Sequence, residues 1–180
     1  MARKVPPLGV SKAMAQRAVD MGAFERPAPE LQRYAGANRY LTACDAAKQN
    51  FDEVETVVIA SGENFPDALS AAGLAGSYEA PLLLVKKDDV PDAVLGTIED
   101  LGATSAVIVG GPAVVSSIAV TQLEDEGLAV TRVFGDDRYK TSAAVAREIA
   151  ECEGHINSVF LARGDDFPDA LAVSPMAYSG

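Results

Sequence analysis

The chain has 180 residues, 48% of them hydrophobic, and a formal net charge of −11 at pH 7. So acidic a chain is repelled by nucleic-acid phosphates and by anionic lipid, and no apolar run reaches the roughly 20 residues that span a bilayer. We therefore expect neither a nucleic-acid partner nor a membrane span.

The N-terminal region differs from the rest of the chain. Apolar residues at helical spacing predict a short helix over 9–22, and the proline-containing stretch 24–30 reads as a linker. The first residues are basic, but no apolar stretch follows them, so they do not form a signal peptide. We assign residues 1–32 to a helical extension and linker outside the main module.

From residue 39 onward, helix-like and strand-like segments alternate. Apolar residues at helical spacing (Tyr40, Ala43, Cys44 and Ala47) begin the series. Strands are predicted at 54–60, 81–85, 105–111, 128–134 and 156–162, and further helices at 66–78, 91–101, 114–126, 138–153 and from 168. This alternation predicts an α/β fold, with a mostly parallel sheet flanked by helices.

Two segments recur about 100 residues further along the chain. Residues 33–42 read RYAGANRYLT and residues 132–141 read RVFGDDRYKT, while 60–69 (ASGENFPDAL) and 162–171 (ARGDDFPDAL) share seven of ten residues. We therefore expect tandem βα repeats, the first over 33–131 and a partial second over 132–180. The second lacks counterparts of the strands at 81–85 and 105–111. Because that leaves a half-built sheet, we expect the natural protein to continue or another chain to complete the sheet.

The FPDAL segment lies where a strand is followed by a helix. Ser61 and Asn64 belong to the turn, and Asp67 falls in the first helical turn. A carboxylate there stabilises the positive end of the helix, which is a purely structural role. Alternatively, because ligands bind at the carboxyl ends of parallel strands, Asp67 accepts a hydrogen bond from a sugar hydroxyl or pairs with a basic group.

Arg39 and Arg138 stand at predicted helix N-termini, where the helix dipole disfavours a cation. One explanation is an ion pair with Asp67 or Asp169 of the same or the next repeat. The other is that each arginine and the free helical amides face one anionic ligand. The sequence leaves both open.

Other residues have simpler interpretations. Tyr40 and Tyr139 are expected in the core, Thr42 and Thr141 as local caps, Cys44 and Cys152 as buried or half-buried free thiols, and His155 on the surface. With one histidine and no GxSxG, HExxH or CxxC motif, the sequence predicts no catalytic set, no metal site and no cofactor.

The motifs occur in the order R-x-x-G-x-x-R-Y-x-T, S-G-x-N-F-P-D-A-L, A-P-L-L-L-V and A-V-I-V-G-G-x-x-V-V-S. In this order they resemble the type 2 cell-wall-binding repeat family. The resemblance implies an extracellular bacterial protein whose compact α/β repeats, typically three in tandem and packed as a pseudo-threefold ring, bind anionic secondary wall polymers. It places the protein at the cell surface, as a possible homo-oligomer or packed against further repeats.

Carried over by position, the resemblance implies ligand contacts in both repeats. They are Arg39, Ser61, Asn64 and Asp67 in the first repeat, and Arg138, Asp166 and Asp169 in the second. Our hypothesis is a non-catalytic module that anchors a surface protein to the wall. The alternatives are a wall-active hydrolase or other α/β enzyme that uses the crevice near Asp67, and a purely structural assembly.

Overall fold

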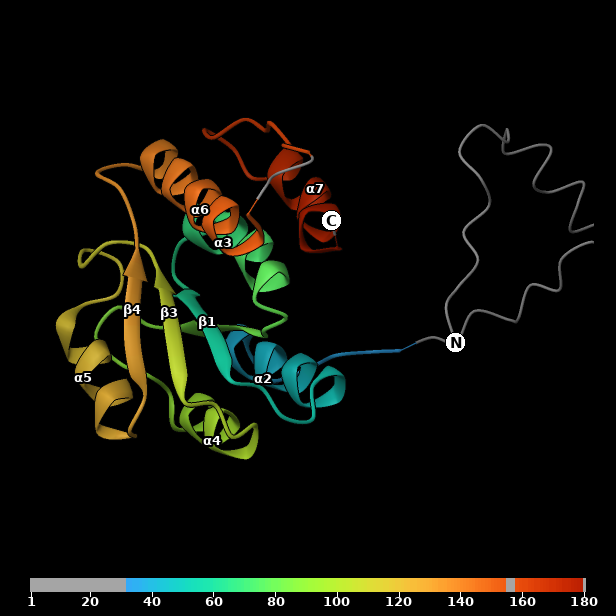
Figure 1. Cartoon of the computed structure of the whole chain (residues 1–180). Helices are drawn as coiled ribbons and strands as arrows, with labels where there is room; N and C mark the ends of the chain where they lie inside the picture. The colour runs from blue at the N-terminus through green and yellow to red at the C-terminus, as the bar shows by residue number, and fades with distance from the viewer. Residues whose placement is uncertain (1–31, 155–157, 180) are drawn as a thin grey trace, which may run out of the picture. The chain divides into compact units, whose positions relative to one another are not determined.

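The computed structural model describes residues 32–154 and 158–179, and from Tyr34 onward these form one unit (Figure 1). The helix predicted over 9–22, the linker after it and His155 lie outside the described residues. The other predicted helices, and the first four predicted strands, are present within three residues of their expected bounds.

A four-stranded parallel sheet forms the centre of this unit. Its strands are β1 (Thr56–Ser61), β2 (Leu82–Val85), β3 (Ser105–Val109) and β4 (Ala129–Val133). Their order across the sheet is β2-β1-β3-β4, and every neighbouring pair is parallel. The predicted α/β class is confirmed.

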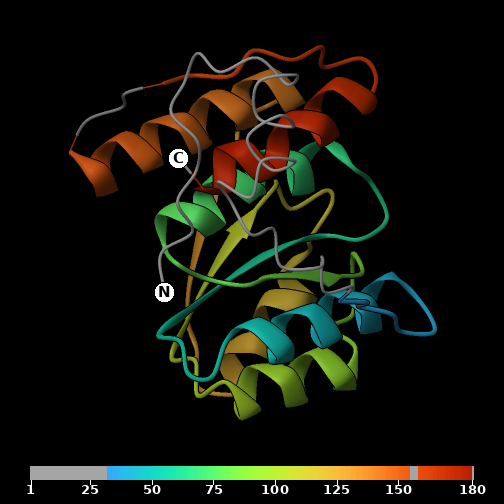
Figure 2. The ribbon, with the colours of Figure 1, turned by 90° about the vertical axis from the view of Figure 1, so that its right-hand side faces the viewer.

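Helices cover both faces of the sheet (Figures 1 and 2). One face carries α2 (Arg39–Asn50), α4 (Asp92–Asp100) and α5 (Ser117–Asp125); the other carries α3 (Pro66–Ser77) and α6 (Arg138–Glu153), and α7 (Pro168–Ser179) packs against α3. The two faces belong to two separate clusters of buried residues. Because both α6 and α7 pack against it, α3 joins the first repeat to the second.

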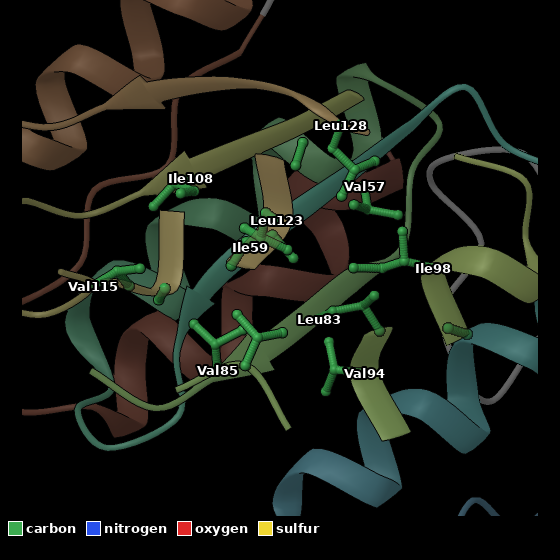
Figure 3. Packing of buried hydrophobic residues seen from close by; sticks show 14 of the residues in the cluster. Val57, Ile59, Leu83, Val85, Val94, Ile98, Ile108, Val115, Leu123 and Leu128 are labelled. Carbon is green, nitrogen blue, oxygen red and sulfur yellow. The ribbon is translucent and has the colours of Figure 1, made fainter. Parts of the chain in front are cut away.

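The strands divide their side chains between these two clusters. Val57 and Ile59 point into the cluster under α2, α4 and α5, of which Figure 3 shows the packing, whereas Val58 and Ala60 point into the cluster under α3 and α6. All four are 0% exposed. Successive side chains in a strand alternate between faces, so an apolar run of this kind is buried on both sides.

The strand predicted over 156–162 is the exception. Its described part, residues 158–162, belongs to no strand. Val57 and Ile59 are 0% exposed in β1, but their counterparts Val159 and Leu161 are 68% and 94% exposed. In the first repeat β2 and β3 flank β1 on either side. Among the described residues of the second repeat no strand corresponds to β2 or β3, and none pairs with this tract.

Candidate functional site

The corner between β1 and α3 lies at the carboxyl edge of the sheet. From the adjacent central strands β1 and β3, the chain leads outward in opposite directions, to β2 and to β4. The gap between their carboxyl ends is the topological switch point, where open α/β sheets bind ligands. Asp67, in the first turn of α3, lies there: a β-carbon at Gly110, which follows β3, would come within 2.8 Å of Asp67 Oδ2. Gly110 also has a φ of 121°, so this close approach requires glycine.

Arg39 and Arg138 occupy equivalent positions at the starts of α2 and α6. Arg39 Nη1 donates a hydrogen bond to the Gly62 carbonyl oxygen, and Arg138 Nη1 donates one to the Gly164 carbonyl oxygen over 2.7 Å. Each guanidinium is therefore held by the carbonyl of the turn that precedes the FPDAL helix of its own repeat. This contact offsets the unfavourable position of a cation at a helix N-terminus.

The tyrosine that follows each arginine explains why each turn has a glycine, because the tyrosine ring leaves no room for a side chain. A β-carbon at Gly62 would lie 2.6 Å from Tyr40 Cε1, and the same holds, at a shorter distance still, for Gly164 and Tyr139. Tyr40 packs against the core, as predicted. The prediction for Tyr139 is wrong, since it is 63% exposed. Among the described residues no strand follows α6, so in that part of the chain no sheet of the second repeat covers this ring.

Thr42 and Thr141 have the local role that the sequence predicts. Their hydroxyl oxygens accept hydrogen bonds from the backbone N–H groups of Gly36 and Gly135, at 3.0 and 3.1 Å. The chain is thus turned into α2 and α6 in the same way. Four positions of the R-x-x-G-x-x-R-Y-x-T motif therefore have structural roles in both repeats.

Arg132, the first arginine of this motif in the second repeat, was missed by the sequence analysis. Its Nη1 donates a hydrogen bond to the Gly110 carbonyl oxygen over 2.6 Å, and burial lowers the pKa of the guanidinium. It therefore reaches from β4 to the same turn that Asp67 approaches. The repeated arginine was the available signal, but only the fold shows which carbonyl it meets.

Arg138 of the second repeat influences the charge state of Asp67 in the first repeat. Burial raises the pKa of the half-buried Asp67 carboxyl group, and the attraction of Arg138 partly opposes this rise. Among the described residues the two groups form no direct ion pair, but Arg138 Cζ lies 5.9 Å from the centre of the Phe65 ring. The second repeat thus places a cation beside the FPDAL corner of the first, as an electrostatic neighbour rather than a contact ion pair.

The remaining candidate residues differ in accessibility. Ser61 is 1% exposed and its hydroxyl accepts a hydrogen bond from the Glu63 backbone N–H, so it serves the turn itself. Asn64, Asp166 and Asp169 are exposed. One carboxylate oxygen of Asp166 accepts a hydrogen bond from the backbone N–H of the next residue.

The structure places the two free cysteines differently. Cys44 is buried, as expected, but Cys152 is exposed near the end of α6, so that half of the prediction is wrong. Among residues 32–154 and 158–179, no three His, Cys, Asp or Glu side chains are arranged to hold a metal ion. None of the helices described is long and apolar enough to cross a membrane.

These features define a parallel α/β repeat module in which three elements recur: a glycine turn, an FPDAL helix, and an arginine clamp, meaning an arginine whose guanidinium is hydrogen-bonded to the carbonyl oxygen of that turn. The model of one family, cell wall binding domain 2 (CWB2), matches residues 33–120 and 132–180. The chain belongs to this family, and the predicted resemblance is confirmed.

Known relatives carry the same module within longer chains. The chain is 34% identical over 147 residues to the N-acetylmuramoyl-L-alanine amidase LytC of Bacillus subtilis (strain 168), covering 82% of this chain and 29% of that protein. It is 31% identical to the amidase enhancer of the same organism, covering 81% and 20%. The solved structure of Cwp6 from Clostridium difficile matches with a TM-score of 0.76 at 35% identity, over 81% of this chain and 23% of that one. The chain spans less than a third of each of these proteins.

Proposed function

We propose that this cell-wall-binding module anchors a larger bacterial surface protein non-covalently, by binding an anionic polymer of the wall. The module itself catalyses no reaction. Its units are the repeats 33–131 and 132–180, preceded by the extension 1–32, and the two segments matched by the family model support this division. The two Bacillus relatives, an amidase and an amidase enhancer by name, are much longer than this chain. Their lengths leave room for other domains beside a binding segment that resembles this chain.

The observation that carries the proposal is the repeated arginine. Arg39 and Arg138 are exposed, and each uses a hydrogen bond to a turn carbonyl to hold its side chain in place. A guanidinium has five N–H donors, so such a clamp leaves others for a phosphate or carboxylate. The fold therefore presents cations at equivalent corners of successive repeats, which suits a polymer with repeating negative charge.

Co-sedimentation with purified Gram-positive cell wall tests the proposal. We expect the chain to pellet with intact wall and to remain in solution when the anionic polymer has been extracted from the wall. Arg39→Gln should weaken binding, and the matched control is Arg147→Gln, which removes an exposed arginine from α6. Thermal unfolding of both variants checks that the fold is retained. Equal pelleting with intact and extracted wall would refute an anionic ligand.

We propose no catalytic role for the crevice near Asp67. Within the described part of the chain, no hydrogen bond links its carboxyl group to a nucleophile, a histidine or a second acid. General acid–base chemistry needs such a partner or a substrate proton within hydrogen-bonding reach. Turnover of a wall glycan that Asp67→Asn abolishes would instead support the hydrolase alternative.

A further inference from the structure

Strand β4 carries the start of the second repeat into the sheet of the first. Arg132, the first residue of the repeated R-x-x-G-x-x-R-Y-x-T motif, lies in β4, which pairs in parallel with β3. Its guanidinium donates a hydrogen bond to the Gly110 carbonyl oxygen over 2.6 Å, and the Gly110 N–H donates one to the Val133 carbonyl oxygen over 3.0 Å. The start of this motif is therefore a strand that adds to the sheet of the preceding unit.

The same motif in the first repeat begins with Arg33, but there it adds to no sheet within the described residues. Residues 32–36 form no strand, and Arg33 is exposed, with no hydrogen bond or ion pair to any described residue. No described residue forms a hydrogen bond with the backbone of residues 32–34. This segment therefore keeps available the backbone groups and the guanidinium that β4 uses for docking.

The turn after each segment is the same in both repeats. Gly36 and Gly135 each lie three positions after the first arginine, and a β-carbon on either would come 2.4 Å from the β-carbon of the residue five positions further on. The chain thus enters α2 and α6 through one kind of turn. The backbone of the first segment is tied to α2 at Ala35, whose N–H donates a hydrogen bond to Asp45 Oδ2 over 2.9 Å. That contact lies one position beyond the three residues that match the end of β4.

The side chains of residues 32–34 suit the place that β4 occupies. Gln32 corresponds to Thr131, which is exposed. Tyr34 corresponds to the half-buried Val133, which packs against the cluster under α3 and α6. A polar residue therefore matches the solvent side and an aromatic ring matches the packed side, with an arginine between them in both segments.

We propose that residues 32–34 add as a parallel strand to the sheet of a second unit of this fold, at a β3 edge that carries no β4. Arg33 then donates a hydrogen bond to the carbonyl oxygen of the glycine turn that follows this edge. Ladder hydrogen bonds supply affinity and the arginine supplies register, as when an extended segment joins an open sheet edge. Because β4 already occupies the β3 edge of the wild type, this contact does not join two wild-type copies.

Freeing the β3 edge in the whole chain tests this strand addition. Val130 and Val133 pack against the two core clusters, so Val130→Asp with Val133→Asp should release β4 while the chain keeps its own Arg33. Sedimentation velocity should then show head-to-tail association beyond that of the wild type. Adding Arg33→Gln should weaken this association about tenfold, the effect of one charge-assisted hydrogen bond, whereas adding Arg147→Gln, on α6, should not.

Transplanting the segment into β4 gives a second measurement that needs no free edge. Thr131→Gln with Val133→Tyr gives β4 the sequence of residues 32–34, because the arginine is common to both. Hydrogen exchange should find the Gly110 N–H as protected as in the wild type. The matched control reverses the order, with Thr131→Tyr and Val133→Gln. It places the amide on the packed side, and the Gly110 N–H should lose protection.

The outcomes decide as follows. Association that depends on Arg33 supports the strand addition; where the double aspartate variant is unfolded, a protected Gly110 N–H in the transplanted strand supports it. A folded double aspartate variant that stays monomeric overturns it, as does association that Arg33→Gln leaves unchanged. Loss of Gly110 protection in Thr131→Gln with Val133→Tyr also overturns it, because the segment then cannot replace β4. None of these results depends on wall binding, so the anchoring function can fail while the strand addition holds.

Discussion

The ring of Tyr40 covers Gly62 so closely that a β-carbon on the glycine would lie 2.6 Å from Tyr40 Cε1. Gly62 also supplies the carbonyl oxygen that holds Arg39. Two consecutive residues at the start of α2, Arg39 and Tyr40, therefore both contact Gly62 in the turn after β1. The same arrangement recurs at Gly164, so the corner is a built feature of each repeat.

Gly62→Ala should destabilise the protein by about 1–3 kcal/mol, the cost typical of overpacking a well-packed site. The matched control is Gly96→Ala in the middle of α4, where a β-carbon would have no atom within 4 Å. That change should stabilise the protein by about 0.4–1 kcal/mol, because alanine restricts the unfolded chain. Urea unfolding measures both changes. A neutral Gly62→Ala would mean that Tyr40 moves aside at no cost.

The junction between Asp67 and Arg138 makes a prediction about pKa. Burial raises the pKa of the Asp67 carboxyl group above its ordinary 3.8, and Arg138 lowers it. Removing the cation in Arg138→Gln should raise this pKa further, as measured by NMR titration of the carboxyl carbon. Arg147→Gln, elsewhere on α6, should leave it unchanged.

The same shift fixes how Asp67 contributes to stability. An acid with a raised folded-state pKa contributes stability that is fully present below the unfolded pKa and is lost as pH rises through the folded one. As the pH rises from about 3 to 7, the free energy of unfolding of the wild type should therefore fall relative to that of Asp67→Asn. If the wild type instead gains stability relative to Asp67→Asn over this range, the pKa of Asp67 is not raised.

Tyr78 at the end of α3 predicts alkaline sensitivity. Its hydroxyl donates a hydrogen bond to Glu148 Oε1 over 3.0 Å; burial, then Cys152 and Glu148, raise its pKa above 10.0. The stability that this tyrosine contributes is present below pH 10.0 and is lost at higher pH. The free energy of unfolding should therefore fall more steeply above about pH 10 in the wild type than in Tyr78→Phe. Equal slopes would show that the phenol is solvated.

Thiol chemistry distinguishes the two cysteines. Cys152 is exposed and Cys44 is buried, and reaction with a thiol reagent requires access to the sulfur. The native protein should release one equivalent of chromophore from an aromatic disulfide reagent, and the unfolded protein two. Cys152→Ser should abolish the native signal. Rapid reaction of both thiols in the native state would show that α2 opens from the sheet.

Much of the fold follows from local patterns in the sequence. The alternation of apolar strand segments with helical stripes predicts the parallel sheet, because strands buried on both faces read as continuous apolar runs such as VVIA in β1. The recurrence of R-x-x-G-x-x-R-Y-x-T and FPDAL predicts two equivalent corners. Glycine and threonine act there through contacts within their own repeat.

Only the tertiary structure decides what depends on partners far apart in the sequence. The tract 156–162 has the composition of a strand, yet its described residues form none. A strand needs neighbours for its backbone hydrogen bonds, and no strand of the described residues lies beside this tract. The contact between Phe65 and Phe167, and the electrostatic influence of Arg138 on Asp67, depend on how α7 and α6 pack against α3. Sequence periodicity records which face of a helix is apolar, but not which other helix will cover it.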